Sequence, residues 1–200
     1  VVGMTTDGHS FAQDAIDRGA KVLVVERKVY LADATDATEI VVKDTRKAMA
    51  AAAANFYDHP SKDLALVGIT GTNGKTTTTY LVEHIASVAG NRCGVIGTVG
   101  NKIAGVMEHA ERTTPESPDL QKLFARMRDA GCTVVAMEVS SHALDLRRTW
   151  DTDFAVTAFT NLTQDHLDYH HTFDDYFEAK ALLFSKDYPA RRVISIDGSW

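Results

Sequence analysis

The sequence predicts an α/β fold with a mostly parallel sheet, preceded by a small, truncated N-terminal α/β unit. Short apolar runs of the length of buried strands alternate along the chain with stretches of helical periodicity. The apolar run at residues 64–69 passes through a glycine-rich turn directly into a helix. Polar residues gather just after the ends of several apolar runs, which is the edge where open parallel sheets bind ligands.

Residues 1–60 are expected to form the N-terminal unit. Ser10 and Asp44 are placed to cap its two helices, because their side-chain oxygens can accept free backbone N–H groups. A polar stretch around Pro60 then separates this unit from residues 61–200 and predicts the domain boundary. The expected helices and strands of the unit, in chain order, are residues 10–18, 22–25, 39–42 and 45–57.

The glycine-rich turn predicts a phosphate-binding P-loop. Backbone N–H groups of such a loop, with a helix N-terminus behind them, suit phosphate oxygens. Lys75 would reach the terminal phosphates, and the hydroxyl of Thr76 would hold Mg²⁺. The spacing departs from GxxxxGK[ST], since Gly71 lies only three residues before Gly74. The alternative is a glycine turn after a strand that carries a surface lysine.

The rest of the chain continues the alternation. Strands are expected at residues 93–99, 134–139, 154–160 and 193–196. Apolar residues of the helix that follows the glycine turn share one face, at positions 81, 82, 85, 88 and 89. Residues 100–117 are expected to be a long connection. Ser117 should cap the next helix, and Thr172 should cap a last helix over 173–184. The first of these two helices presents a core face of Leu120, Leu123, Phe124 and Met127.

Composition narrows the class of protein. The chain of 200 residues is 44% hydrophobic with a net charge of −6, and no block of Lys or Arg indicates nucleic acid or an anionic membrane as partner. No apolar run approaches the length of a membrane span. Cys93 and Cys132 lack metal-binding spacing and are expected to be buried thiols in a reducing cytoplasm. We expect the chain to be a piece of a longer protein, because it opens inside an apolar, strand-like run.

Two polar clusters at strand ends are candidates for chemistry. Glu138 follows an apolar run and could take the acidic Mg²⁺ position of a nucleotide site; the alternative is a solvated strand-end carboxylate. Residues 165–171 are rich in Asp and His, and His166 and His170 would share a helix face. That segment could be a polar loop or a zinc pair, although no Cys pair or HExxH motif supports zinc. Beside a nucleotide, a histidine that assists Mg²⁺ or orients phosphate is the favoured interpretation.

Taken together and in this order, the motifs resemble the Mur ligases, and among them the tripeptide synthetases. The motifs are TGTNGKTT, RTTPE, MEVSSHAL, FTNLTQDHLDYH and YFEAKALLF. The opening DGHSFAQDAIDRGAKVLVVE also resembles the end of the first domain of those enzymes. The resemblance implies that residues 1–60 are the remainder of an N-terminal domain that binds the UDP substrate. Residues 61–200 would then be a truncated central ATP-binding domain, and the C-terminal domain that binds the amino acid is absent.

The resemblance also implies a reaction. ATP would phosphorylate a carboxylate of UDP-MurNAc-L-Ala-D-Glu, and the amine of meso-diaminopimelate or L-lysine would attack the acyl phosphate. The expected cofactors are ATP and Mg²⁺, and the expected place is the cytoplasm, in peptidoglycan precursor synthesis. A monomer is expected, with no nucleic-acid or membrane partner. The fragment is expected to be inactive alone.

Site residues are carried over from the resemblance by position. The catalytic set would be Lys75, Glu138, His166 and Lys180, the last as a carbamate. Metal ligands would be Thr76, Glu138, His166 and the Lys180 carbamate. The nucleotide would be held by Gly71, Thr72, Asn73, Gly74, Lys75, Thr76, Thr77 and Asn161, and the muramoyl dipeptide by Thr113, Thr114, Ser140 and Arg148.

Burial of Lys180 is also expected from the residues themselves. The helix over 173–184 has a core stripe at Phe173, Tyr176, Phe177 and Leu183, and Lys180 lies on the same side. The usual fate of a helix lysine is exposure to solvent.

Departures from the family pattern limit what can be carried over. Arg112 and Leu146 stand where some relatives have amides, so contacts with the sugar and dipeptide could differ. Two other functions therefore stay open at this point: a nucleotide-binding module without ligase activity, and another ATP-dependent carboxylate–amine ligase such as a polyglutamate synthase.

Overall fold

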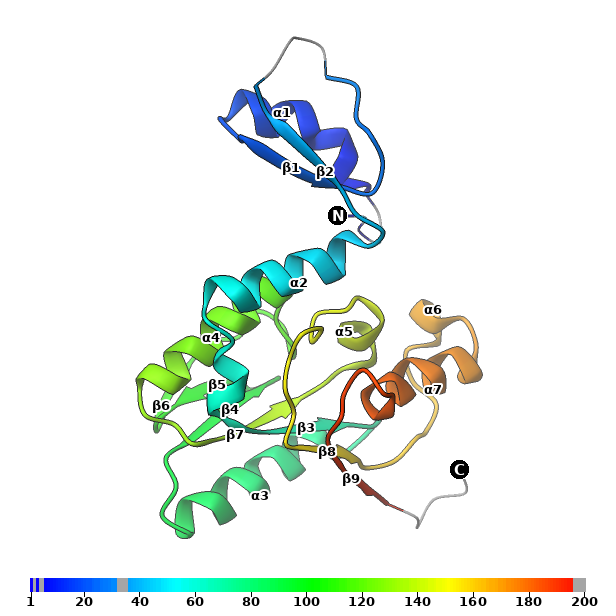
Figure 1. Ribbon diagram of the computed structural model, residues 1–200. Coiled ribbons are helices and arrows are strands. Elements are labelled where there is room, and N and C mark those ends of the chain that lie inside the picture. The colour runs from blue at the N-terminus through cyan, green and yellow to red at the C-terminus, as the bar shows by residue number, and fades with distance from the viewer. Residues whose placement is uncertain (2, 4–5, 32–35, 196–200) are drawn as a thin grey trace.

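The computed structural model describes residues 1, 3, 6–31 and 36–195, and it confirms the predicted fold class. A two-stranded parallel sheet, β1 with β2, forms the N-terminal part, and a seven-stranded sheet forms the main body. Figure 1 shows α2 leading from the small sheet to the large one. Within the described residues, no helix is both long and apolar enough to cross a membrane. The expected strand end at Ile196 lies outside the described residues.

The N-terminal elements agree with the sequence except at the first helix. A 3₁₀ turn, η1 (Gly8–Phe11), precedes α1 (Ala12–Asp17), and the cap is Asp7, whose side chain accepts the N–H of His9. The prediction of Ser10 as the cap was therefore wrong, because Asp7 captures the chain one turn earlier. Asp44 caps as predicted by accepting the N–H of Lys47. The other elements of this part are β1 (Val22–Val25), β2 (Thr38–Val41) and α2 (Thr45–Phe56).

The large sheet has the strand order β6-β5-β4-β7-β3-β8-β9. Strands β4, β7, β3, β8 and β9 are parallel to one another, and β5 is antiparallel to both of its neighbours. The carboxyl ends of the parallel strands therefore meet at one edge. The strands are β3 (Ala65–Thr70), β4 (Cys93–Gly97), β5 (Gly100–Ile103), β6 (Val106–Glu108), β7 (Val134–Glu138), β8 (Val156–Phe159) and β9 (Arg191–Ile194).

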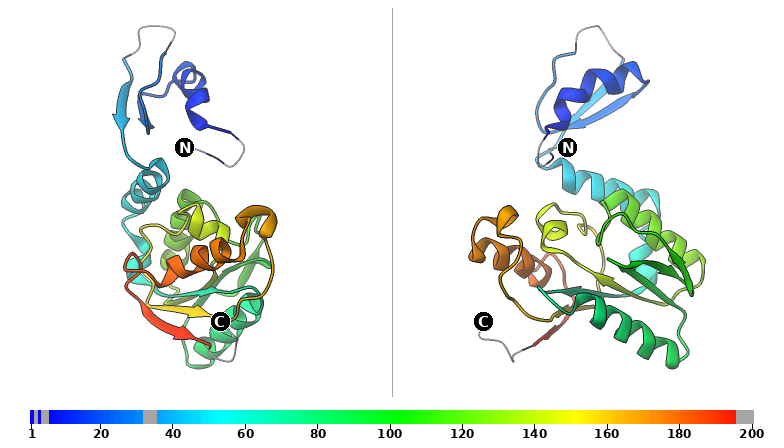
Figure 2. Two further views of the ribbon diagram at one scale, coloured as in Figure 1. Left: turned by 90° about the vertical axis from the view of Figure 1, so that its right-hand side faces the viewer. Right: turned by 180° about the vertical axis from the view of Figure 1, so that it is seen from behind.

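Helices cover both faces of this sheet. Figure 2 shows α3 (Lys75–Val88) on one face, with α4 (Ser117–Asp129), α5 (Ser141–Asp145) and α7 (Phe173–Ala181) on the other. The connecting elements are η2 (Pro60–Asp63), α6 (Leu167–His170) and η3 (Leu182–Phe184). The main core lies under α4, where the predicted face of Leu120, Leu123, Phe124 and Met127 is buried. Cys93 and Cys132 are buried free thiols, as predicted.

The apolar face of α3 points away from the sheet. Leu81, Ile85 and Val88 are 55%, 66% and 76% exposed, whereas Thr79 and Glu83 form the buried side of the helix. Buried Glu83 is paired with a cation, since the amine of Lys102 of β5 lies 2.9 Å from its carboxylate. Helical periodicity correctly indicated an amphipathic helix but could not show which face meets the sheet.

The stretch after β4 is a hairpin and not the predicted long connection. Strands β5 and β6 pair as antiparallel neighbours across a tight turn at Ala104 and Gly105. Both turn residues have positive φ, as a two-residue hairpin turn requires. An Ala at the first turn position is an unusual residue for such a turn, which explains why the sequence did not reveal the hairpin.

The close-packed core predicts the size of one stability effect. Phe124 is fully buried between α4 and the sheet. In the full-length protein, Phe124→Ala should lower the free energy of unfolding by about 3–5 kcal/mol, and Phe124→Leu by clearly less, because alanine leaves the larger cavity. Urea unfolding followed by circular dichroism measures both. Equal losses for the two variants would contradict close packing at this position.

Candidate nucleotide-binding site

Gly71 fixes the path of the chain as it leaves β3. Its φ is +141°, and a Cβ at this position would lie 2.0 Å from the hydroxyl of Thr160 and 3.0 Å from the carbonyl of Asn161. Any side chain here would collide with the segment that follows β8. Glycine therefore allows the loop between β3 and α3 to lie directly against residues 160–163.

Asn161 holds that loop through hydrogen bonds to its backbone. Its side-chain oxygen accepts the N–H of Asn73 at 3.0 Å, and its side-chain nitrogen donates to the carbonyl of Asn73 at 3.2 Å. The carbonyl of Asn161 also accepts the N–H of Thr72. Asn161 thus acts on the backbone of the loop and does not itself line the cavity described below.

Glu138 is preorganised at the end of β7 by groups from two other elements. Its Oε2 accepts a hydrogen bond from the Thr76 hydroxyl at 3.0 Å, and its Oε1 accepts the N–H of Thr98 at 2.9 Å. The residue is 2% exposed. Gly97 leaves room for this carboxylate, since a Cβ on Gly97 would lie 2.3 Å from its Oε1.

The pair of Thr76 and Glu138 fits a magnesium ion. Both supply hard oxygen atoms, and Mg²⁺ in nucleotide sites keeps several waters and takes only one or two protein ligands beside phosphate oxygens. Within the part of the chain that the structure describes, no three His, Cys, Asp or Glu side chains gather as a metal site. A site built from protein ligands alone is therefore not what these residues form.

Two lysines converge on one carbonyl oxygen. Lys75 and Lys180 both donate to the carbonyl of Gly71, at 3.0 and 2.9 Å, and Lys75 also donates to Thr72. Lys180 is 1% exposed. Burial, followed by repulsion from Lys75, lowers the pKa of Lys180 to about 7. Burial also lowers the pKa of Lys75, and Glu138 and Asp165 oppose that shift.

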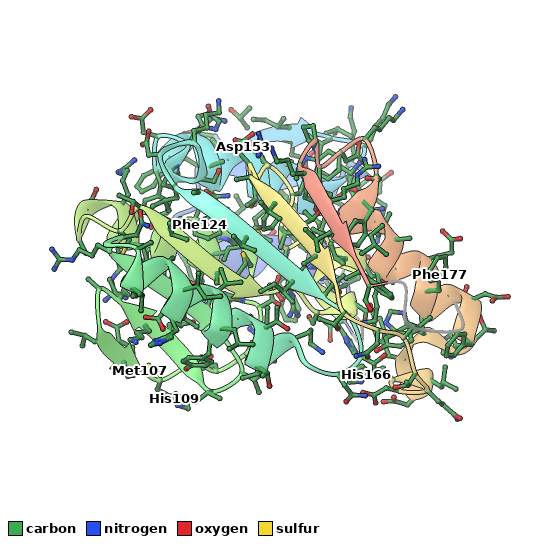
Figure 3. All side chains as sticks on the ribbon, turned by 90° about the horizontal axis from the view of Figure 1, so that it is seen from below. Met107, His109, Phe124, Asp153, His166 and Phe177 are labelled. Atoms are coloured by element: carbon green, nitrogen blue, oxygen red, sulfur yellow. The ribbon has the colours of Figure 1, made fainter. Side chains whose placement is uncertain are left out.

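The predicted burial of Lys180 is confirmed, but the stripe predicted around it was partly wrong. Tyr176 and Leu183 are fully buried, whereas Phe177 is 42% exposed. Figure 3 shows Phe177 on the outer side of α7, away from the sheet. The buried stripe runs instead through Tyr176, Ala179 and Lys180, with Leu183 in η3.

A cavity of about 310 Å³ opens above the glycine loop. It is where the carboxyl ends of β3, β4, β7 and β8 meet, and Figure 3 shows His166 at this edge of the sheet. Thr77 is exposed on α3 and does not line the cavity. The lining residues are Thr72, Asn73, Gly74, Lys75, Thr76, Thr98, Thr113, Glu138, Ser140, Ser141, His166 and Lys180.

A second cavity of about 370 Å³ adjoins the first and shares Thr98, Thr113, Ser140 and His166 with it. It adds Thr114 and Arg148, both predicted to contact the muramoyl dipeptide, and also Arg112 and His142. Leu146, the other departure from the family pattern, lines a different cavity.

Arg148 is held in place from two directions. Its guanidinium lies 2.9 Å from the carboxylate of Glu116 and donates to the carbonyl of Thr114 at 3.2 Å. Its Nε is buried without a partner among the described residues. An unpaired buried donor is costly, so this atom is suited to an acceptor on a ligand.

Aromatic rings surround His166. The ring of His142 lies 5.0 Å from that of His166 and 4.1 Å from that of Tyr169, and burial lowers the pKa of His142. His170 does not line the cavity; its ring forms a 2.9 Å hydrogen bond with the hydroxyl of Ser141, which does. The geometry therefore does not join His166 and His170 into a zinc pair.

Sequence reasoning missed four residues of this site: Gly97, Thr98, Ser141 and Tyr176. Thr98 follows a parallel strand, as Glu138 does, so the same rule about strand ends could have found it. Gly97 and Tyr176 act through contacts between distant segments, and no local pattern signals them.

A strand, a glycine loop and a helix, with a lysine and a Thr–Glu pair at the loop, define a P-loop nucleotide-binding fold. The chain belongs to the Mur ligase family: the Mur ligase middle domain matches residues 69–200. Residues 1–57 match the segment described as "Mur ligase family, catalytic domain".

Comparison with individual proteins agrees with this assignment. The UDP-N-acetylmuramoyl-L-alanyl-D-glutamate–2,6-diaminopimelate ligase of Clostridium botulinum is 47% identical over 100% of this chain, which spans 41% of that relative. A solved structure of a ligase with the same description is 31% identical, with a TM-score of 0.80 over 96% of this chain and 38% of that one. MurF ligase from Thermotoga maritima, solved with ADP, is 21% identical with a TM-score of 0.54. The match spans 98% of this chain and 42% of the MurF chain. This last likeness concerns the fold alone.

The contact between Gly97 and Glu138 gives a test of the site. In the full-length protein, Gly97→Ala should push the carboxylate of Glu138 away from Thr76 and weaken Mg²⁺-dependent ADP binding at least several-fold, as measured by calorimetry with and without Mg²⁺. Gly94→Ala is the matched control on the same strand, because its Cβ would meet the flexible end of Met127 and a methyl group of Val135 and would not touch Glu138. Equal losses of binding in both variants would contradict a specific role for Gly97.

Proposed function

We propose that this chain is the ATP-binding part of a ligase that adds a diamino acid to UDP-MurNAc-L-Ala-D-Glu. The observation that carries the proposal is the pair of adjoining cavities, one with a lysine and a Thr–Glu pair at a glycine loop, the other with a half-buried arginine, Arg148. The first suits a nucleotide with Mg²⁺, and the second suits an anionic substrate whose carboxylate must reach the nucleotide. The similar proteins described above are ligases that are named for this substrate and for 2,6-diaminopimelate as the added amino acid.

The proposal includes the organisation of the complete protein. Residues 1–60 would be the remainder of the domain that binds the UDP substrate, and residues 61–200 part of the central ATP-binding domain. The chain spans about two fifths of the length of the curated relatives it matches. The residues that select the diamino acid would lie outside this chain, and meso-diaminopimelate and L-lysine remain the two candidates. The enzyme would work as a cytoplasmic monomer in peptidoglycan precursor synthesis.

Charge neutralisation is the main task of the first cavity. A carboxylate and the terminal phosphate of ATP repel each other, so their reaction needs fixed positive charge between them. Lys75 is well placed for this because its amine folds back onto the loop carbonyls and is free to move to a bound phosphate. Mg²⁺ held by Thr76 and Glu138, with His166 near a second ion, would supply further positive charge. Gly71–Thr77 would cradle the phosphates, with Asn161 supporting the loop.

The second cavity would bind the muramoyl dipeptide. Thr113 and Ser140 face both cavities and so lie where the dipeptide would approach the nucleotide. Thr114 is buried and its hydroxyl donates to the carbonyl of Glu138 at 2.9 Å, which makes it a support for the site more than a direct contact. The buried Nε of Arg148 would donate to the anionic substrate.

Lys180 would act as a carbamate. Its neutral amine would attack CO₂ and lose a proton, giving a carbamate anion whose oxygens can hold the second Mg²⁺. Near neutral pH a substantial fraction of Lys180 is neutral, because its pKa is lowered to about 7. An unmodified, protonated Lys180 would place positive charge beside the metal and repel it.

Lys75→Ala tests the nucleotide assignment in the full-length enzyme. ADP release that requires both the UDP-linked dipeptide and a diamino acid is expected for the parent, and a loss of at least a hundred-fold in kcat is expected for the variant with its fold intact. A coupled assay for ADP and circular dichroism measure the two properties. Turnover near the parental rate in the variant would overturn the assignment.

Lys180→Ala tests the carbamate. Activity of the full-length enzyme should fall by at least ten-fold and be partly restored by a short carboxylic acid such as acetate, because the added carboxylate replaces the carbamate. In the parent protein, a carbamate signal from ¹³CO₂ in NMR should grow as pH rises through about 7 at fixed dissolved CO₂, because the neutral amine becomes more abundant. Unchanged activity of the variant would contradict the role.

A further inference from the structure

Tyr176 of α7 joins the glycine loop to Lys180, although no local pattern marks it as a site residue. The side chain is completely buried. Its hydroxyl lies 3.1 Å from the hydroxyl of Thr72, and its ring lies 4.3 Å from the amine of Lys180. The same side chain therefore touches the loop that would hold the nucleotide and the lysine that shares the Gly71 carbonyl with Lys75.

The hydrogen bonds of Thr72 determine which way the tyrosine bond runs. The Thr72 hydroxyl donates to the carbonyl of Thr163 at 3.1 Å, and it accepts the N–H of Thr163 at 3.0 Å. A threonine hydroxyl has one proton and two lone pairs, so its proton is already used. Tyr176 must be the donor to Thr72. All three positions of the Thr72 hydroxyl are thus satisfied, which fixes its orientation in the loop.

The ring of Tyr176 adds a second constraint. An aromatic face attracts an ammonium group within about 6 Å of its centre. Before any carbamate forms, it therefore holds the amine of Lys180 beside the loop, where that amine donates to the Gly71 carbonyl. The hydroxyl thus contacts Thr72 directly, and the ring reaches the adjacent Gly71 indirectly, through the amine of Lys180.

We propose that Tyr176 is a positioning residue for the nucleotide-binding loop: it holds Thr72 through its hydroxyl, and its ring holds Lys180 while that lysine is unmodified. The inference rests on the proposed function, since it assumes that the loop binds a nucleotide. The hydroxyl presets the loop before the nucleotide arrives, so its loss should weaken nucleotide binding. The chemical step should change less, because Tyr176 does not line the cavity.

Tyr176→Phe in the full-length enzyme is the direct test, because it removes the hydroxyl and keeps the ring. ADP affinity by calorimetry and KM for ATP should both weaken about five-fold, the usual effect of one buried hydrogen bond. The value of kcat should stay within two-fold of the parent, which separates positioning from catalysis. Tyr176→Leu removes the ring as well and should also lower kcat, because Lys180 loses its support.

Tyr188→Phe is the matched control. Tyr188 is also buried, at 3% exposure, and its hydroxyl lies 2.9 Å from the hydroxyl of Thr149. The variant therefore loses a buried tyrosine–threonine hydrogen bond that does not touch the loop. Its melting temperature should fall by about as much as that of Tyr176→Phe, with parental nucleotide affinity.

Substitutions at Thr72 test the same hydrogen bond from its other partner. Thr72→Val should weaken ADP binding at least as much as Tyr176→Phe, and Thr72→Ser should retain most of the affinity. The double variant Tyr176→Phe with Thr72→Val should bind no more weakly than Thr72→Val alone, because the two hydroxyls act through one bond.

Three results would overturn the inference. They are parental ADP affinity in Tyr176→Phe, an equal loss of affinity in Tyr188→Phe, and fully additive losses in the double variant. A parent enzyme that binds no nucleotide would overturn the proposed function and this inference with it. A parent that binds, together with an unaffected Tyr176→Phe, would overturn the inference alone.

Discussion

The close approach of the loop after β3 to the segment after β8 is the constraint on which the site depends. It exists only because Gly71 has no side chain, since a Cβ there would lie 2.0 Å from the Thr160 hydroxyl. The approach turns the Gly71 carbonyl toward Lys180 of α7 and lets Asn161 hold both the N–H and the carbonyl of Asn73. The conformation of the short loop after β3 is therefore fixed by contacts with α7 and with the segment after β8, both distant in sequence.

This constraint also creates the unusual electrostatics of the site. Two lysine amines lie against one carbonyl oxygen in a largely buried place, so burial lowers the pKa of both, and the charge of Lys75 lowers that of Lys180 further. The carboxylates of Glu138 and Asp165 oppose the shift of the Lys75 pKa, and Asp165 opposes that of Lys180. The result is that Lys180, with a pKa lowered to about 7, is suited to titrate near neutral pH within hydrogen-bonding reach of the carbonyl that Lys75 also contacts.

Local sequence patterns predicted many features that local chemistry controls, but the caps predicted at Ser10 and Ser117 were wrong, since Asp7 caps the first helical turn and Glu116 is the N-cap of α4. The strand, loop and helix around Lys75, the cap at Asp44, the core face of α4 and the strand-end position of Glu138 were all predicted and are present. The burial of Lys180 followed from its register with Tyr176. The cavity lining agrees with most of the predicted residues, although their chemical roles stay predictions.

What the sequence could not predict depends on contacts between distant segments. Thr98 reaches Glu138 across the sheet, and Tyr176 reaches Thr72 from another helix. The hairpin of β5 and β6 was missed because its turn contains Ala104 in place of the residues that favour such turns. The face of α3 was ambiguous because its sheet side carries Thr79 and Glu83, and the burial of Glu83 depends on Lys102 of another strand.

The outward apolar stripe of α3 has a practical consequence for handling these residues in isolation. Helix α3 exposes an apolar stripe to solvent, formed by Leu81, Ile85 and Val88. Contiguous exposed apolar surface favours self-association. A preparation limited to these 200 residues should therefore self-associate through this apolar stripe as the protein concentration rises. Such self-association would reveal nothing about the number of subunits in the complete protein.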